Sequence, residues 1–185
     1  MNTPHFTHRL ATEADLGALA LIMNRSIDAL QKGFLSSEAI AASRLVMGLD
    51  TQLITDQTYF IVERAGRIAG CGGWSRRATL YGGDHSTSLR DATLLDPAHD
   101  PARVRAMYTD PDYTRQGVGR LILGLCETAA ADSGYKSVRL MATLAGEPLY
   151  RACGYREIER VNSATALGPV PLILMEKPLQ SKMGT

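Results

Sequence analysis

The sequence predicts an α/β fold of the α+β type, with a central mixed sheet of six to seven strands and helices on both of its faces. Three observations lead to this fold class. Strand-like segments alternate with amphipathic helical segments, two neighbouring strands are joined by a tight turn, and a later strand leads into a long helix as a βα unit. The 185 residues suffice for a substantial core, so we expect one domain over residues 1–185.

The first part of the chain predicts a strand followed by two helices. The strand is expected at about residues 6–10. Thr12 and Asp15 resemble a capping box at the start of the first helix. Its buried stripe is formed by apolar residues at helical spacing, Leu16, Leu19, Ala20, Met23 and Ile27. The segment SSEAIAASRLVMGL predicts the second helix, with Ser36 or Ser37 as the N-cap.

The middle of the chain predicts a hairpin and a long loop. The segment TYFIVERAGRIAGCGGW contains two strands around a turn at Ala65 and Gly66. Residues 79–101 lack sustained periodicity and are rich in Gly, Asp and Pro. We interpret them as a loop, and loops of this length in compact domains are usually functional or mobile.

The second half predicts the remaining strands and helices. RVRAMYT is a strand, and a turn at DPDY leads into a helix that ends at Gly134. The buried face of this helix carries Val118, Leu121, Ile122, Leu125, Cys126 and Ala129. KSVRLMATL is a strand, GEPLYRA is a short helix, and YREIERVN and PLILMEK are two closing strands. The predicted order is β-α-α-β-β-β-α-β-α-β-β.

The composition excludes several classes of function. A formal net charge of +1 offers no concentrated basic surface for a nucleic acid or a membrane. No run approaches the roughly 18 apolar residues of a membrane span, and MNTPHFTHRL lacks the apolar core of a signal peptide. We therefore expect a cytoplasmic protein that binds neither nucleic acid nor membrane. The sequence leaves open whether it forms a homodimer.

The cysteines and histidines do not predict a metal site. Cys71, Cys126 and Cys153 are odd in number and far apart, which argues against a disulfide framework or a zinc site. We expect each to be a small buried apolar residue. The four histidines show neither H-x-x-x-H nor H-E-x-x-H spacing, so we expect no metal.

Two glycines at the start of the long helix, Gly117 and Gly119, require a physical reason. Glycine in a helix is unfavourable by about 1 kcal/mol relative to alanine. An anion site supplies a reason, because glycines admit a ligand to the backbone and the free N–H groups of a helix start attract negative charge. The segment is neither a Walker phosphate loop, because the lysine of that motif is absent, nor a dinucleotide-binding motif, because the third glycine is absent. The alternative to an anion site is a loop that leads into the helix and binds no ligand.

Three segments together resemble the GNAT superfamily of acyl-CoA-dependent N-acetyltransferases. MYTDPDYTRQGVGRLILGLCETAA is similar to the family's acyl-CoA-binding segment, whose loop reads [Q/R]-x-x-G-x-[G/A]. LYRACGYREIE is similar to the family's Tyr-x-x-x-Gly-[Phe/Tyr] segment, and HRLATEADLGALALIMNRS resembles its first strand and helix. The resemblance covers roughly residues 6–178. It implies a GNAT-like fold of bacterial type that transfers an acetyl group from acetyl-CoA to a primary amine of a small molecule or protein.

The resemblance also implies roles for individual residues. Tyr150 would be the catalytic general acid that protonates the departing CoA thiolate, with a tyrosine packed under the cofactor as the alternative. The main chain of Met107 and Thr109 would pair with the pantetheine arm. The remaining cofactor-binding residues would be Arg115, Gln116, Gly117, Val118, Gly119, Arg120, Thr143 and Arg151. The acceptor pocket would be lined by Phe34, Trp74 and Tyr81, each with core packing as the alternative.

The chain departs from the family pattern at three positions. Thr114 stands where the loop usually has Gln or Arg, and Thr143 stands where an Asn often contacts the cofactor. The strand at residues 103–109 contains no carboxylate to act as a base. The titratable groups of the long loop, Asp84, His85, Asp91, Asp96, His99 and Asp100, are candidates to select a cationic acceptor or relay its proton.

Two other functions stay open at this point. A non-catalytic acyl-CoA-binding regulatory module on the same fold would need no base. A nucleotide-binding protein could use RQGVGR for another phosphate ligand. Tyr150 in its matched place favours the enzyme.

Overall fold

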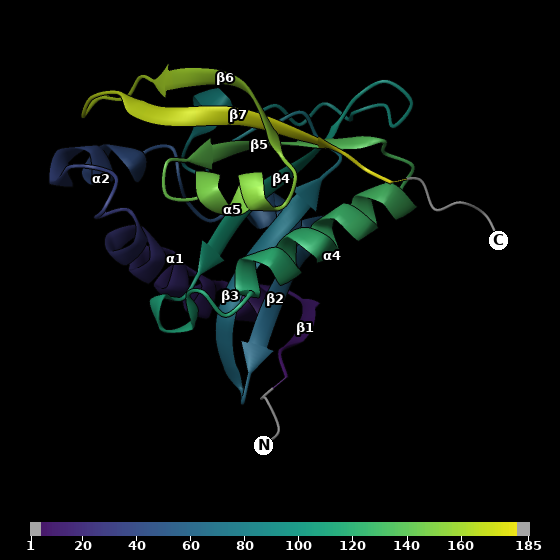
Figure 1. Cartoon of the computed structure of the whole chain (residues 1–185), viewed down its shortest axis with the longest axis horizontal. Helices are drawn as coiled ribbons and strands as arrows, with labels where there is room; N and C mark the ends of the chain where they lie inside the picture. Colours follow the sequence, from purple (N-terminus) through teal and green to yellow (C-terminus); the bar gives the residue numbers. More distant parts are fainter. Residues whose placement is uncertain (1–4, 181–185) are drawn as a thin grey trace.

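A seven-stranded mixed sheet runs through the molecule, as the sequence predicts (Figure 1). The computed structural model describes residues 5–180. The strands lie in the order β1-β2-β3-β4-β5-β7-β6. Their bounds are β1 Thr7–Leu10, β2 Tyr59–Arg64, β3 Arg67–Ser75, β4 Ala102–Thr109, β5 Ser137–Thr143, β6 Arg156–Ser163 and β7 Val170–Pro178. The helices are α1 Leu16–Leu30, α2 Ser37–Ser43, α3 Thr51–Thr55, α4 Val118–Asp132 and α5 Glu147–Ala152.

The sheet divides at β4 and β5, which within residues 5–180 are the one neighbouring pair of strands that is parallel. These two strands pair only at Ala102 with Val138 and at Arg103 with Arg139. Beyond these pairs the strands separate, although β4 continues to Thr109 and β5 to Thr143. The separation leaves backbone groups of both strands without a ladder partner, and it positions the candidate site described below.

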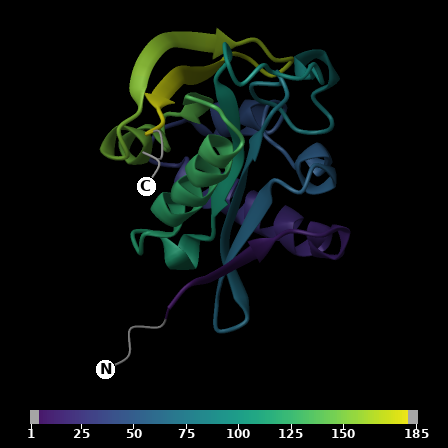
Figure 2. The same ribbon diagram turned by 90° about the vertical axis from the view of Figure 1, so that its right-hand side faces the viewer.

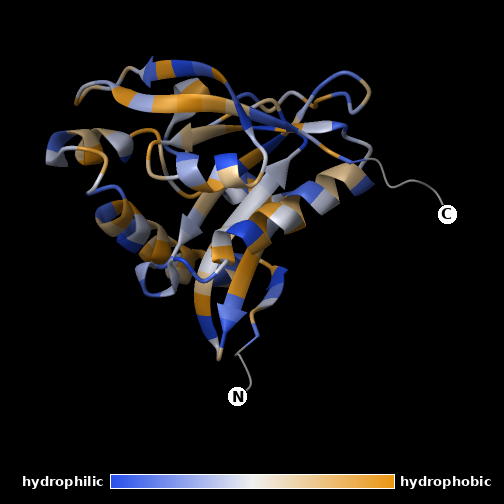
Figure 3. Cartoon of the chain, viewed as in Figure 1, coloured by the Kyte–Doolittle hydropathy of each residue, from blue (hydrophilic) through white to orange (hydrophobic). Residues whose placement is uncertain are grey.

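Helices cover both faces of the sheet, so that the core has two main parts (Figure 2). On one face, α4 buries Val118, Ile122 and Cys126 against the sheet. On the other face, α1 buries Leu19, Ile22 and Ile27 against β3 and β4. Apolar and polar residues alternate along both helices in Figure 3, as expected for helices with one face on a core. None of the helices in residues 5–180 is long and apolar enough to cross a membrane.

The predicted caps of the first two helices are confirmed. A short 3-10 turn at Glu13–Asp15 precedes α1, and the Thr12 backbone N–H donates to the Asp15 carboxylate at 2.8 Å. The Arg9 guanidinium donates to both oxygens of the same carboxylate, at 2.8 Å each. At α2, the Ser36 hydroxyl oxygen accepts from the Ala39 N–H at 3.2 Å. Each side chain satisfies an N–H at or near a helix start that has no acceptor within the helix.

The Asp15 cap predicts a pH-dependent stability. Its hydrogen bonds with Arg9 hold the pKa of Asp15 at about 2, below its ordinary value of 3.8, so the stabilisation is complete above about pH 4 and is lost toward pH 2. We expect Asp15→Asn to lower the free energy of unfolding by about 1 kcal/mol at pH 7. Urea unfolding should show this difference narrowing between pH 4 and pH 2.

The matched control for this substitution is Glu13→Gln. It removes the same charge from the same turn, but the Glu13 side chain is exposed and takes part in no hydrogen bond or ion pair with the rest of residues 5–180. Its effect should stay within about 0.5 kcal/mol at every pH. Equal losses in both variants would show that net charge, rather than the cap, sets the pH dependence.

The second predicted helix is shorter than expected, and a third helix follows it. The helical part of SSEAIAASRLVMGL ends at Ser43, and α3 begins only at Thr51. The N–H of Thr51 is satisfied by the Asp84 carboxylate, with N–O distances of 3.1 and 3.2 Å. This partner lies 33 residues away in the chain, and the side chain of the N-cap residue Asp50 makes no cap hydrogen bond. The start of α3 therefore depends on a distant residue, and its five residues are too few to show a period.

Candidate active site

The candidate site begins at an irregularity in β4. Cys71 pairs with Tyr108 and Gly73 with Arg105, so that Ala106 and Met107 together face Gly72 as a β-bulge. Ala106 has a φ of 52°, in the left-handed region that residues other than glycine rarely adopt. The bulge turns the backbone of β4 just where β5 has separated from it.

Two contacts hold the bulge in place. The Tyr59 hydroxyl, buried on β2, donates to the Ala106 carbonyl oxygen at 2.7 Å. A Cβ on Gly72 would lie 2.8 Å from the Met107 Cγ and 2.7 Å from the Ile122 Cγ2, so only glycine fits opposite the bulge. The backbone at Ala106 and Met107 is therefore fixed from the neighbouring strand and from β2.

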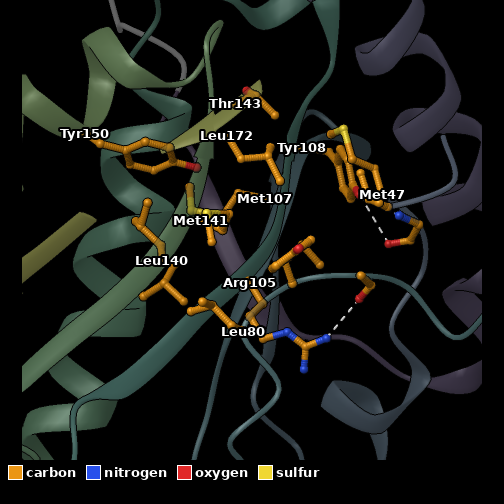
Figure 4. A pocket seen from close by; sticks show the side chains of 16 residues that line it. Met47, Leu80, Arg105, Met107, Tyr108, Leu140, Met141, Thr143, Tyr150 and Leu172 are labelled. Carbon is orange, nitrogen blue, oxygen red and sulfur yellow. Dashed lines mark hydrogen bonds between the residues drawn. The ribbon is translucent and has the colours of Figure 1, made fainter. Parts of the chain in front are cut away.

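A pocket of about 100 Å³ fills the gap between β4 and β5 (Figure 4). It is lined by sixteen residues from β4, β5, β7, α5, the segment after α2 and the start of the long loop. They are Val46, Met47, Gly48, Leu80, Tyr81, Gly82, Val104, Arg105, Ala106, Met107, Tyr108, Leu140, Met141, Thr143, Tyr150 and Leu172. The structure thus brings together four residues singled out from the sequence, namely Tyr81, Met107, Thr143 and Tyr150.

Tyr150 contributes its hydroxyl to one side of this pocket (Figure 4). Its ring packs edge-on against Tyr155, with the centroids 5.8 Å apart, and close over Gly146, where a Cβ would lie 2.8 Å from the Tyr150 Cε2. The hydroxyl makes no hydrogen bond with any other residue in 5–180. Burial raises the pKa of Tyr150, so the phenol is protonated at neutral pH.

Thr143 shapes the turn that carries Tyr150. Its hydroxyl oxygen accepts from the Gly146 backbone N–H at 3.1 Å, just before α5 begins at Glu147. This contact fixes the entry of α5 and hence the direction of the tyrosine ring. Thr143 therefore has a local structural role, whatever else it contacts.

The glycine loop before α4 has the backbone geometry of an anion site. Arg115 and Gly117 have φ values of 62° and 87°, and Gly117 is the N-cap of α4. The first intrahelical acceptor is the Gly117 carbonyl, which accepts from Leu121, so the N–H groups of Val118, Gly119 and Arg120 have no acceptor within the helix. A Cβ on Gly117 would meet no atom within 4 Å, so the space beside it is open.

Other predicted residues of this segment have structural contacts. The Gln116 side chain accepts from Arg64 Nη1 at 2.7 Å and donates to the Asp112 carbonyl at 3.1 Å, which stiffens the loop. A Cβ on Gly119 would lie 2.6 Å from Leu149 Cδ2, so this glycine allows α4 to approach α5. Arg120 is exposed, and Thr109 pairs with Gly70 at the end of β4.

Three further residues singled out from the sequence also lie outside the pocket. Trp74 is 3% exposed and packs edge-on against Tyr135 in the core next to α4. Phe34 is 50% exposed, on the turn after α1. Arg151 forms ion pairs with Glu147 and Glu157 at 2.8 and 2.6 Å. Phe34 and Trp74 were predicted to line the acceptor pocket because they are aromatic, but the sequence did not show to which side of β3 the Trp74 side chain points.

The long loop is tied to the body of the protein more firmly than its composition suggests. Ser86 Oγ donates to the Leu45 carbonyl at 2.8 Å, and Arg90 Nη2 lies 2.9 Å from Asp50 Oδ1. Together with the Asp84 cap on α3, these contacts hold α2, α3 and the loop together. The start of this loop is therefore anchored to the segments around α2 and α3.

The acidic and histidine side chains near the end of this loop do not line the pocket. His99 Nδ1 and Asp96 Oδ2 are 2.9 Å apart, and the Asp96 backbone N–H donates to Asp100 at 2.8 Å. His99 is largely exposed, beside the start of β4 rather than its bulge. Among residues 5–180, no group of three or more His, Cys, Asp or Glu side chains is placed to hold a metal ion.

Sequence reasoning missed Arg105, the one charged residue among those that line the pocket. It also missed the apolar lining supplied by Val46, Met47, Leu140, Met141 and Leu172. A signal for Arg105 existed, since it is one of two arginines, with Arg103, on the strand that was predicted to reach the site. The apolar residues carried no such signal, because they do not differ by type from the core.

Comparison with known proteins places this geometry among acetyltransferases. Residues 55–157 match the family profile described as an acetyltransferase (GNAT) domain. The GCN5-related N-acetyltransferase from Rhodopseudomonas palustris aligns with a TM-score of 0.69 at 20% identity, over 97% of this chain and 98% of that chain. The ribosomal-protein-S18-alanine N-acetyltransferase from Escherichia coli aligns with a TM-score of 0.59 at 21% identity, over 97% of both chains.

A third solved structure was determined with its coenzyme. The PaiA N-acetyltransferase from Thermoplasma acidophilum, in complex with coenzyme A, aligns with a TM-score of 0.63 at 14% identity, over 94% of this chain and 99% of that chain. No curated protein sequence matches the chain significantly. At these identities the structural likeness establishes the fold, and the profile match establishes the family.

Proposed function

The chain belongs to the GNAT acetyltransferase family, and on that premise we propose that it transfers an acetyl group from acetyl-CoA to a primary amine. The observation that carries the proposal is the pocket between β4 and β5, where the Tyr150 hydroxyl and the β4 bulge line one small cavity. The acceptor is proposed to be a small molecule or an exposed protein amine.

The binding of acetyl-CoA is assigned to the glycine loop and the separated strands. The N–H groups from Arg115 to Arg120 would hold the pyrophosphate, aided by the dipole of α4. The main chain of Met107 and Thr109 would pair with the pantetheine arm. A backbone N–H at the bulge would stabilise the negative charge that develops on the thioester oxygen.

The ion pairs of Arg151 limit what this residue would contribute. Its guanidinium would reach a coenzyme phosphate only while shared with Glu147 and Glu157. The side chains of Arg115 and Arg120 are exposed and have no hydrogen bond or ion pair within residues 5–180, so they are the stronger candidates for phosphate contacts.

Tyr150 would donate a proton to the departing thiolate. A phenol with an ordinary pKa near 10 transfers a proton to a thiolate, whose conjugate acid has a pKa near 8.5, only against an uphill gap, and burial of Tyr150 widens it. The donated hydrogen bond would therefore contribute about 10-fold to 100-fold to the rate, with positioning of the reactants contributing more.

A panel of primary amines with acetyl-CoA, monitored by release of free thiol, tests the proposal. We expect acceptor-dependent release with at least one class of amine. Tight acetyl-CoA binding by calorimetry without turnover on any amine would favour the non-catalytic module instead. That alternative has one supporting observation, since the residues that line the pocket include no carboxylate and no histidine.

A further inference from the structure

The wall of the pocket contains a buried cation. Arg105 lies on β4, two residues before Met107, and its side chain is 3% exposed. The side chains around it in the pocket are mainly Val, Leu, Met and Tyr. Figure 4 shows Arg105 and Tyr150 on different sides of the cavity. A charged side chain is rarely buried this far without a partner of opposite charge.

The partners of Arg105 occupy one end of its guanidinium. Nη2 donates to the Gly82 carbonyl oxygen at 3.0 Å and forms an ion pair with Asp50. Asp50 is itself fully buried and also pairs with Arg90, so one carboxylate faces two guanidinium groups. Asp84 favours the charged form of Arg105 from further away. These contacts fix the orientation of the Arg105 side chain.

The Nε–H of Arg105 is buried and has no hydrogen-bond partner within residues 5–180. Buried N–H groups in native proteins almost always have an acceptor, supplied by protein, water or ligand. Burial lowers the pKa of Arg105 to about 10, so the group is still a cation at neutral pH. The free donor therefore belongs to a charged group, which makes its strongest hydrogen bonds with anionic oxygen.

We propose that Arg105 binds a carboxylate of the acceptor, and that the acceptor is a free amino acid with a small apolar side chain. This inference rests on the proposed acetyl transfer. Arg105 and Met107 line the same small pocket on either side of the Ala106 bulge, so one small molecule can present its amine to the proposed thioester site at Met107 and its carboxylate to Arg105. The apolar walls and the small volume accommodate a short apolar side chain better than a chain segment of a protein.

Matched acceptor pairs test the class of acceptor. Each of the apolar proteinogenic amino acids is compared with its own carboxamide, by thiol release with saturating acetyl-CoA. The amide keeps the size and the amine but removes the negative charge. We expect kcat/KM to be at least tenfold higher for the best amino acid than for its amide. The amide has the more weakly basic amine, which is more available for attack, so amine basicity does not account for such a preference.

Two conservative variants test the residue. Arg105→Lys keeps a cation for Asp50 but removes the Nε–H, and we expect it to abolish the preference for carboxylate over amide. Arg90→Lys makes the same change at the other partner of Asp50, outside the pocket lining, and should keep the preference. Calorimetry with acetyl-CoA and thermal melts of both variants report whether the fold is retained.

The outcomes separate this inference from the proposed function. Turnover of amides or uncharged amines at rates equal to those of amino acids overturns the carboxylate site and leaves acetyl transfer intact. A preference that survives Arg105→Lys in a folded variant assigns the carboxylate to another residue and also overturns the inference. Absence of acetyl-CoA binding to the wild-type protein contradicts the proposed function itself, and the inference falls with it.

Discussion

Replacement of Gly117 by valine is expected to weaken acetyl-CoA binding at least tenfold, which corresponds to about 1.4 kcal/mol. Gly117 has a φ of 87° at the N-cap of α4, and the space beside it is open. A valine would fill that space with two methyl groups beside the N–H groups assigned to the pyrophosphate. It would also strain the left-handed backbone that presents these groups. Isothermal titration with acetyl-CoA measures the change.

Gly168→Val is the matched control for this substitution. Gly168 lies between β6 and β7 with a φ of 118°, and a Cβ there would also meet no atom within 4 Å. The control therefore imposes backbone strain of a similar kind away from the α4 start. We expect a comparable loss of thermal stability in both variants and a loss of affinity only in Gly117→Val. Unchanged affinity in a folded Gly117→Val protein would place the coenzyme elsewhere.

Tyr150→Phe is expected to lower kcat by about 10-fold to 100-fold with little change in the KM for acetyl-CoA. The substitution removes the proposed proton donor but keeps the ring on Gly146 and Tyr155. Because the hydroxyl has no hydrogen-bond partner in residues 5–180, no buried bond is broken, and the free energy of unfolding should change by less than about 0.5 kcal/mol. Single-turnover thiol release isolates the chemical step.

Tyr155→Phe is the matched control, because it is expected to change the stability of the protein and not its kcat. The Tyr155 hydroxyl donates to Glu127 Oε1 at 3.0 Å, outside the pocket. Its removal should lower the free energy of unfolding by about 1 kcal/mol and leave kcat unchanged. A Tyr150→Phe enzyme with the wild-type single-turnover rate would reduce Tyr150 to a packing residue.

Much of the fold could be predicted because its signals are local. The apolar stripe of α4, the Thr12 cap and the turn at Ala65 and Gly66 each fall within one short segment. The third helix depends on Asp84, and the bulge at Ala106 depends on Tyr59 and Gly72. These partners are distant in the sequence and become adjacent only when the chain folds, so no local sequence pattern predicts the contacts between them.

The part of the site that lies in short sequence motifs could be predicted, and the part that depends on distant segments could not. The glycine loop and Tyr150 belong to short motifs, and the sequence singled them out directly. Arg105 gains its significance from Asp50, Gly82 and the cavity beside them, which three separate segments supply. Trp74 was predicted to line the acceptor pocket, and it lies on β3 beside β4. Its side chain nevertheless faces the core, so its residue type and its strand did not suffice to place it.

The short seam between β4 and β5 has a mechanical consequence. Among the described residues, two backbone pairs join a four-stranded panel, β1 to β4, to a three-stranded panel, β5 to β7. A ligand that forms hydrogen bonds with the unpaired edges of both strands would complete the interrupted ladder and would connect the two panels. We therefore expect a ligand bound in this cleft to stiffen the whole sheet, because it would join the two panels at the place where the fewest backbone bonds hold them together.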